Sequence, residues 1–227
     1  MTRYVVIDFE TASCADLTKV GAWRYAEDVS TFILCLGYKI VTDNAPGPTV
    51  VLAEREIRDR HPELLELVLD PGVIFVAHNA GFEQAIWQHI MVAQHHWPPL
   101  AIERWHDTMA VAARYTLPLN LDKLSSTLKL NVQKDREGHA LMMQMCKPNH
   151  RTGNFDHPPE RMLRLMKYNV ADVDAQYEAH CKLGGLGPQE RAVWMLNERA
   201  NQRGILVDEP YVRQAIGLLE ASRAPME

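Results

Sequence analysis

The stretch YVVIDFET, residues Tyr4 to Thr11, is an apolar, β-forming run that leads into two acidic residues. Alternate side chains of a strand lie on the same face, so we expect Asp8 and Glu10 to point in the same direction. Two adjacent carboxylates repel each other, and this repulsion costs stability unless metal ions or protons occupy the site. On its own the pair is equally compatible with a strand end that meets solvent. Acidic residues elsewhere in the chain are needed to distinguish a metal site from an exposed strand end.

The order of the other expected elements predicts the fold class. Short apolar runs predict strands over residues 31–40, 49–52 and 73–77. Helical spacing predicts helices over residues 53–69, with a kink at Pro62, and over residues 158–182. Shorter helices are expected from residue 82, from an N-cap at Asp107 or Thr108 through residue 115, and between residues 117 and 145. Strands first, then mixed elements, then helices predict an α/β layered fold, a central mixed sheet flanked by helices.

The clearest break in the sequence is Gly184-Gly185-Leu186-Gly187-Pro188, which is typical of a domain boundary. It divides the chain into a domain of residues 1–183 and a segment of residues 184–227. In the second part we expect helices over residues 189–203 and 209–223, with a short strand or turn over residues 205–207. That part is too small for an enzyme, so we expect a short helical C-terminal appendage.

Composition limits the classes of protein to consider. The 227 residues are 47% hydrophobic with no apolar run long enough for a bilayer, so no membrane partner is expected. The N-terminus is unlike a secretory signal and the four cysteines form no CxxC pair, which favours the cytoplasm and free thiols. The net charge of −5 argues against a broad basic surface for nucleic acid, but not against an enzyme that binds nucleic acid locally.

Carboxylates on two further segments turn the first pair into a candidate site. Glu83 follows a buried strand and a turn at the start of a helix, where an acid also stabilises the helix dipole. Tyr168 and Asp172 are four residues apart on the long helix and share a face, and Asp is a poor residue for a helix interior. Carboxylate oxygens suit Mg²⁺ or Mn²⁺. Two such ions can hold the attacking and leaving oxygens of a phosphodiester hydrolysis.

Three short motifs carry a resemblance to a known class of enzymes. The strings DFET (residues 8–11), HNAGFE (78–83) and YNVAD (168–172) resemble, in the same order, the three motifs of the DEDD 3′-5′ exonucleases. That class has the DnaQ-like, ribonuclease H-like fold. A tyrosine four positions before Asp172 is similar to the DEDDy branch, whereas the DEDDh branch has a histidine five positions before it, where this chain has Lys167.

Longer strings make the resemblance more specific and extend it over almost the whole chain. GAWRYAED, AHNAGFEQAIW, WHDTMAVAARYTLPLNLDKL and KDREGHALM resemble the exonuclease region of phage-type family A DNA polymerases. NERANQRGILVD, residues 197–208, resembles the connection from that region into the polymerase thumb. No polymerase motif is visible after it. The resemblance therefore implies either a piece of a longer polymerase, with its polymerase domains as partners, or a stand-alone relative.

The resemblance also implies roles for individual residues. Asp8, Glu10 and Asp172 would hold a first divalent ion, Mg²⁺ or Mn²⁺, and Asp8 and Glu83 a second. Tyr168 would position the nucleophile. The residues implied to contact the terminal nucleotide are Thr11, Asn79 and Phe82, which as a strand end, a turn residue and a core aromatic each have a structural alternative. Lys134 and Arg136 are either phosphate contacts or part of a solvated loop.

The activity implied is proofreading-type hydrolysis of single-stranded DNA from its 3′ end, releasing nucleoside 5′-monophosphates. An exoribonuclease of the same DEDDy class is an alternative, because nothing in the sequence recognises a sugar 2′-hydroxyl. A catalytically silent, nucleic-acid-binding domain of a polymerase is another. One departure supports the silent domain, because the second motif of the DEDD class usually ends in aspartate and here ends in Glu83.

Overall fold

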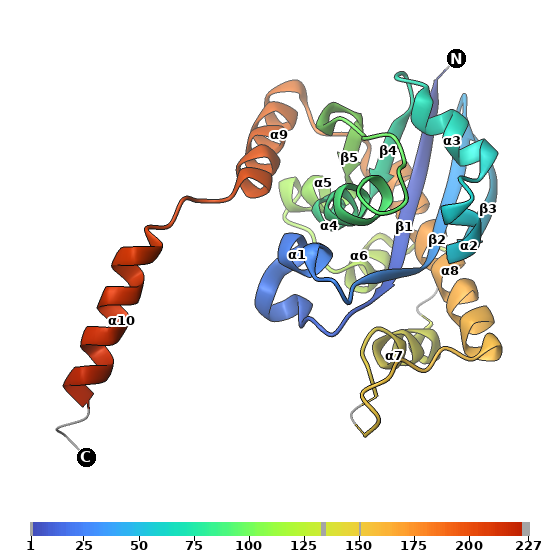
Figure 1. Cartoon of the computed structure of the whole chain (residues 1–227). Helices are drawn as coiled ribbons and strands as arrows, with labels where there is room; N and C mark the ends of the chain where they lie inside the picture. Colours follow the sequence, from blue (N-terminus) through green and yellow to red (C-terminus); the bar gives the residue numbers. More distant parts are fainter. Residues whose placement is uncertain (1, 133–134, 150, 224–227) are drawn as a thin grey trace.

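The computed structural model describes residues 2–132, 135–149 and 151–223, and a five-stranded sheet forms their centre (Figure 1). The strand order is β3-β2-β1-β4-β5, so β1 lies in the middle. The first three strands pair antiparallel along the chain, and β4 and β5 join on the other side of β1 in parallel. The predicted central mixed sheet is therefore confirmed. The strands are β1 (Arg3–Ala12), β2 (Phe32–Thr42), β3 (Ala45–Ala53), β4 (Ile74–Ala77) and β5 (Trp105–Asp107).

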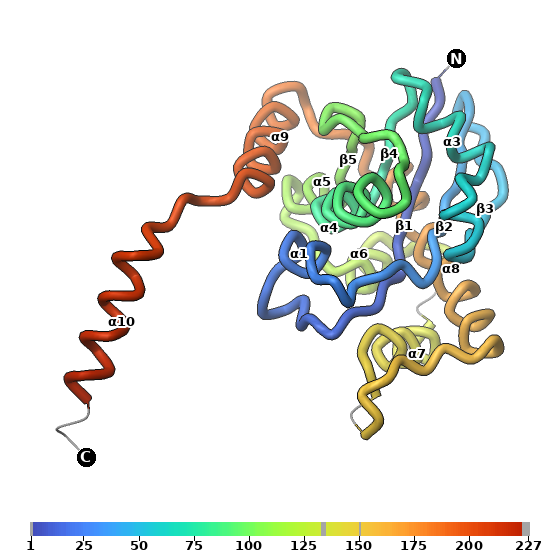
Figure 2. The backbone as a smooth tube through the Cα atoms, in the orientation of Figure 1, coloured from blue at the N-terminus to red at the C-terminus, as the bar shows by residue number. Residues whose placement is uncertain are grey.

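Helices cover both faces of this sheet, as Figures 1 and 2 show. Among the described residues, no helix combines the length and the apolar character needed to cross a membrane. The helices are α1 (Leu17–Glu27), α2 (Glu54–Arg58), α3 (Pro62–Leu69), α4 (Ala80–Ile86), the π-helical η1 (Trp87–Val92), the 3₁₀ turn η2 (Ile102–Arg104), α5 (Thr108–Arg114), α6 (Leu121–Leu128), α7 (Arg136–Met145), α8 (Pro159–Leu183), α9 (Pro188–Arg203) and α10 (Glu209–Arg223).

Alternation along β1 decides which helix meets which face of the sheet. Val5 and Ile7 belong to the main core, which also contains buried residues of α1, α3 and α4. Val6, one residue out of step, packs instead with Val173 of α8. Side chains in a strand alternate between faces, so the even-numbered residues of β1 lie toward α8. Asp8 and Glu10 are even-numbered, and the fold therefore directs both toward the long helix.

Two elements are not predicted by the sequence pattern. Strand β5 has only three residues, which is too short for a periodic signal, and the same residues were expected to lead into a helix cap. Asp107 does cap α5, because its side chain accepts a hydrogen bond from the Met109 N–H at 2.8 Å. Helix α1 contains Gly21 at φ 76°, a conformation that glycine tolerates, and this interruption breaks the helical pattern.

Two further boundaries differ from expectation. Strand β1 continues to Ala12, so the acids lie within the strand and not at its end. The strand or turn expected over residues 205–207 is wrong, because the chain there is irregular. Ile205 and Leu206 are 91% and 98% exposed, and without packing their apolar side chains give no strand.

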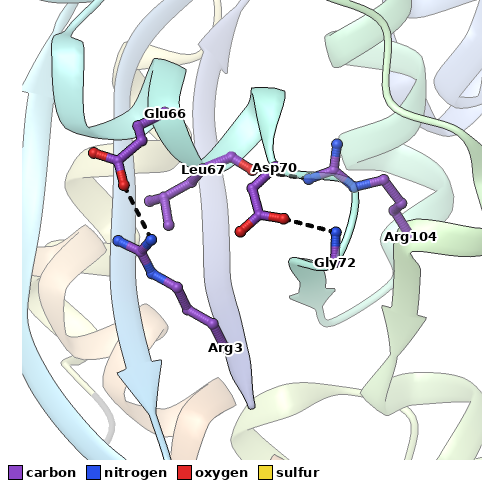
Figure 3. A network of polar contacts seen from close by, with 6 residues as sticks. All are labelled: Arg3, Glu66, Leu67, Asp70, Gly72 and Arg104. Carbon is purple, nitrogen blue, oxygen red and sulfur yellow. Dashed lines mark hydrogen bonds and ion pairs between the residues drawn. The ribbon is translucent and has the colours of Figure 1, made fainter. Parts of the chain in front are cut away.

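Arg104 fastens the edge of the sheet to helix α3, as Figure 3 shows. Its guanidinium donates hydrogen bonds to the carbonyl oxygens of Leu67 at 2.8 Å and of Val73 at 3.0 Å. The carbonyls in the last turn of a helix have no partner within the helix, and a guanidinium satisfies them. On the other side of α3, Arg3 of β1 pairs with Glu66 at 3.2 Å. Helix α3 is thus tied to both β1 and the approach to β5.

The helical C-terminal appendage is confirmed, and its two helices behave differently (Figures 1 and 2). Helix α9 packs at the sheet edge, where Trp194 is 8% exposed and belongs to the main core. Its Gln202 donates a hydrogen bond to Gln84 of α4 at 2.8 Å. Helix α10 has no buried residue and stands apart from the body. The boundary after residue 183 stays a prediction, and residues 224–227 lie outside the described part.

We predict that removing α10 leaves the stability of the protein almost unchanged, whereas removing α9 as well lowers it. A chain ending at residue 207 should unfold within about 2 °C of the full chain, because α10 buries nothing. A chain ending at residue 187 should lose roughly 2–4 kcal/mol, because the site of Trp194 in the core becomes empty. Thermal unfolding measures the first effect and urea unfolding the second, with Trp194→Ala in the full chain as the matched variant. Equal stability of the two truncated chains would show that α9 contributes no packing.

Candidate active site

Three carboxylates from two elements converge beside the sheet. Asp8 and Glu10 come from β1 and Asp172 from α8, and one oxygen of each lies within 4.8 Å of the others. The cause is the alternation along β1, which sends Val6 against Val173 of α8 and therefore sends the two acids toward the same helix. The expectation that Asp8 and Glu10 share a face is confirmed. The structure also brings Asp172 to them.

Two amide side chains of α8 hold Asp8 in place. Asn169 Nδ2 donates to Asp8 Oδ2 at 2.7 Å, and Gln176 Nε2 donates to Asp8 Oδ1 at 2.6 Å. Residues 169, 172 and 176 follow the spacing of one helical face, so the amides flank Asp172. Gln176 Oε1 accepts from the His78 N–H at 3.1 Å, which fixes the direction in which the amide donates. Sequence analysis missed both amides, although their spacing from Asp172 was visible.

A glycine in β2 allows α8 to come this close. Gly37 pairs with Asp8 across the two strands. A Cβ atom on Gly37 would lie 2.0 Å from Asn169 Oδ1 and 2.9 Å from a methyl group of Val173. Real atoms do not approach so closely, so a larger residue would displace the Asn169 side chain or push α8 away from the sheet. The hydrogen bond between Asn169 and Asp8 therefore depends on Gly37.

Burial raises the pKa values of carboxyl groups in this cluster. Desolvation, followed by the charge of Asp172, raises the pKa of Asp8 to about 8, although the hydrogen bonds from Gln176 and Asn169 oppose the shift. Burial and then the charges of Asp8 and Asp172 raise the pKa of Glu10 well above its usual value. Without a cation, part of the cluster therefore holds protons near neutral pH, and divalent ions would replace them.

Glu83 lies in the same cavity but outside the group of three carboxylates. It belongs to the first turn of α4 and is 3% exposed. Burial, followed by the charge of Asp8, raises its pKa well above the usual value. Its Oε2 atom is buried without a hydrogen-bond partner among the described residues. A buried carboxylate oxygen without a donor is costly, and a cation or its water would satisfy it.

Tyr168 adds a hydroxyl next to Asp172. Its hydroxyl interacts with the Asp172 carboxylate and lies 3.5 Å from His139 Nδ1. Burial and then the charge of Asp172 raise the pKa of Tyr168 above its usual value, so the phenol stays protonated and acts as a donor. Gly138 of α7 packs against the ring, since a Cβ there would lie 2.6 Å from Tyr168 Cδ2. His139 and Gly138 were missed by sequence analysis.

The three residues expected to contact a nucleotide lie on the wall of this cavity. Thr11 Oγ1 shares a hydrogen bond of 3.0 Å with the hydroxyl of Tyr25. Asn79 has φ 70°, a conformation that asparagine tolerates, and its N–H donates to Asp107 Oδ1 at 3.0 Å. Phe82 is half-buried and packs on the core, as its structural alternative predicts. Its contact with a nucleotide, and those of Thr11 and Asn79, stay predictions.

One cavity of about 380 Å³ brings together the residues expected to carry the chemistry and to contact the terminal nucleotide. It is open to solvent and lies between β1, the start of α4, the end of α7 and α8. Tyr25, which also lines it, was not expected from the sequence. The expected residues that line it are Asp8, Glu10, Thr11, Asn79, Phe82, Glu83, Tyr168 and Asp172. Arg136 lines a neighbouring cavity, and Lys134 lies outside the described residues.

Comparison with known proteins agrees with this fold. No model of a protein family matches the chain. A DNA polymerase of Bacillus phage SP02 is 31% identical over 228 residues, covering 96% of this chain and 34% of the polymerase. The chain therefore spans about a third of the length of that relative.

Solved structures of Brucella melitensis NrnC share the architecture. NrnC superposes with a TM-score of 0.53 at 15% identity, covering 88% of this chain and 86% of NrnC. The Mg²⁺-bound form of NrnC gives 0.52 at 15% identity over the same shares. The fold is the ribonuclease H-like fold, as predicted. In sequence the chain is similar to a phage DNA polymerase, which confirms the resemblance drawn from its motifs.

We predict that Glu83→Gln stabilises the metal-free protein in a pH-dependent way. The pKa of Glu83 is raised in the folded state, so wild type loses stability as pH rises from the unfolded value, about 4.3, toward the folded one. In EDTA at pH 8 the variant should be more stable by roughly 0.5–2 kcal/mol, and the gain should shrink toward pH 5.

Thermal unfolding across this pH range, in EDTA and in Mg²⁺, measures the effect. Glu220→Gln, on the exposed helix α10, is the matched control and should change nothing. Mg²⁺ should reduce or reverse the gain, because the ion stabilises the charged wild-type site. A gain that is constant with pH would mean that Glu83 is ionised without cost in the folded protein.

Proposed function

We propose that the chain is a metal-dependent 3′-5′ exonuclease that removes nucleotides from the 3′ ends of single-stranded DNA, with release of nucleoside 5′-monophosphates. The observation that carries this proposal is the convergence of Asp8, Glu10 and Asp172 within 4.8 Å, in a cavity that also contains Glu83 and Tyr168. Similarity to a phage DNA polymerase favours DNA and a proofreading role. The proposed setting is the cytoplasm.

The residues present fit two divalent ions, Mg²⁺ or Mn²⁺. Asp8, Glu10 and Asp172 would hold one ion, and Asp8 with Glu83 would hold the other, whose ligand set would include the Glu83 oxygen that lacks a donor among the described residues. All of these donors are carboxylate oxygens, which suit hard cations. When bound, the ions would neutralise the scissile phosphate and lower the pKa of the attacking water.

The protein's own residues orient the reaction. The amides of Asn169 and Gln176 fix both oxygens of Asp8, so this carboxylate keeps one orientation toward the phosphate. Tyr168 is protonated and near Asp172, and in the proposal its hydroxyl orients the water for attack on phosphorus. Thr11, Asn79 and Phe82 would surround the terminal nucleotide in the 380 Å³ cavity.

Two alternatives are weaker. An exoribonuclease would use the same carboxylates, and no described contact recognises a 2′-hydroxyl, so only the polymerase relative favours DNA. A silent domain would have no use for buried, mutually repelling acids, which cost stability. We further propose that residues 1–183 form the exonuclease domain and that residues 184–227 lead toward polymerase domains as partners.

We predict metal-dependent shortening of single strands from the 3′ end. A 5′-labelled DNA strand incubated with Mg²⁺ or Mn²⁺ should give a ladder of shortened products, and EDTA should abolish it. Asp8→Ala should reduce the rate by at least about 100-fold, because it removes the carboxylate common to both proposed ions. Gel electrophoresis of DNA and RNA strands in parallel measures the preference. Stable wild-type protein that degrades neither polymer would overturn the proposal.

We predict that Tyr168→Phe separates positioning from metal binding. Loss of the hydroxyl should lower kcat by about 10–100-fold, while the ring still packs on Gly138. The rise in Tm on adding Mn²⁺ should stay as in wild type, because phenylalanine leaves every carboxylate in place. Asp172→Ala is the comparison and should lose that rise. If both variants lost it equally, the tyrosine would be part of the metal site itself.

A further inference from the structure

Two other cavities adjoin the catalytic one, and they share residues with it. A cavity of about 540 Å³, here the α6 cavity, is lined by residues of α6, α7 and α8 and shares Asp172. A cavity of about 470 Å³, here the loop cavity, is lined by the end of α7, the following loop and the start of α8, and shares Met143 and Lys147. Each of these two cavities offers a route for a strand whose 3′ end lies at the carboxylates.

The α6 cavity is a poor route for a polyanion. Among the described residues, three acids line it, Asp122, Asp135 and Asp172, against two bases, Lys129 and Arg136, and Asp135 also pairs with Arg164. Phosphates that entered here would meet carboxylates on both walls. Like charges at such short range oppose binding, even where salt screens them.

The loop cavity has the opposite balance of charge. Lys147, Arg151 and Arg161 line it, against Asp156 as its one acid among the described residues. Arg161 is held by Asp156 at 3.2 Å and by the Gln144 amide oxygen at 3.0 Å. Lys147 and Arg151 are exposed and form no ion pair with any described residue. Two cations are therefore available to a ligand, in a protein whose net charge is −5.

Local contacts hold the backbone near both cations, of which Lys147 lies beside the catalytic cavity. The Ser13 N–H donates to the Cys146 carbonyl at 3.0 Å, which ties the residue before Lys147 to the chain that leaves β1. Lys147 also lines the catalytic cavity and so stands where the two cavities meet. The Arg151 N–H donates to Asn149 Oδ1 at 2.9 Å, within a turn closed by its own hydrogen bonds.

We propose that the loop cavity binds the sugar–phosphate backbone of the strand on the 5′ side of the terminal nucleotide, with Lys147 and Arg151 contacting successive phosphates. This inference rests on the proposed function. Phosphate contacts position a strand without recognising its sequence. This site therefore favours longer strands and does not discriminate between bases. It also explains how an acidic protein holds a polyanion, through a local pair of cations next to the metal site.

The test compares short and long substrates with the double variant Lys147→Ala/Arg151→Ala. Initial rates with Mn²⁺ are measured for oligothymidylates of two and eight nucleotides. The variant should lose about 10-fold in kcat/KM on the octamer and less than about 2-fold on the dinucleotide, whose only phosphate is the one at the carboxylates. The slope of log(kcat/KM) against log[salt] for the octamer should fall in magnitude by about 1.4, since each single-strand phosphate contact contributes about 0.7.

The matched control removes two cations from the side of the α6 cavity. Lys123→Ala/Lys129→Asn has the same charge change, and asparagine tolerates the left-handed backbone of residue 129, at φ 51°. This control should keep the wild-type octamer rate and salt slope. Equal losses in both double variants, or equal losses on both substrates, would overturn the inference while leaving the nuclease intact. If wild type cleaves neither substrate, the proposed function fails and this inference fails with it.

Discussion

Asp8 accepts a hydrogen bond on each carboxylate oxygen from an amide of α8, and the architecture of the site follows from this contact. Two acids on one face of a central strand and a third on the facing helix repel one another in a buried setting. The two amides offset part of this cost, and they lie on the same helical face as Asp172 and near Tyr168. The packing that sets the position of α8 against β1 therefore also positions the polar groups that α8 supplies to the cavity.

That register has a steric condition on the neighbouring strand. Gly37 lies beside Asp8 in the sheet, and its missing Cβ leaves the space that Asn169 fills. Gly138 plays a similar part on α7, where the ring of Tyr168 occupies the space a side chain would need. Two glycines far apart in sequence thus define how closely the long helix approaches its neighbours. Buried polar groups that must meet at hydrogen-bond distance need such close approach.

Local rules explain what could be predicted from the sequence. Alternation in a strand placed Asp8 and Glu10 on one face, and helical spacing placed Tyr168 with Asp172. The mixed sheet followed from the order of apolar runs. The partners of Asp8 were not predictable in this way, because Gly37 and Asn169 are distant in sequence and meet only through packing. Strand β5 was not predicted for a different reason, because three residues are too few to show an alternating pattern.

Glu83 marks the limit of such reasoning. Its position in a first helical turn is explained by the helix dipole alone, and only the motif resemblance made it a site residue. The structure places it buried in the cavity, where the charge of Asp8 helps to raise its pKa, so the helix dipole alone does not explain its position. Its role as a ligand stays a prediction, as do those of the other site residues.

Helix α4 connects the cavity to the C-terminal helix α9. One side presents Phe82 and Glu83 to the cavity. The other side meets α9, where the Glu198 carboxylate lies 3.1 Å from the position of a Gly81 Cβ and Gln202 bonds to Gln84. Glu83 and Gln84 are neighbours in α4, so the helix that places the Glu83 carboxylate is packed both against the body of the domain and against α9.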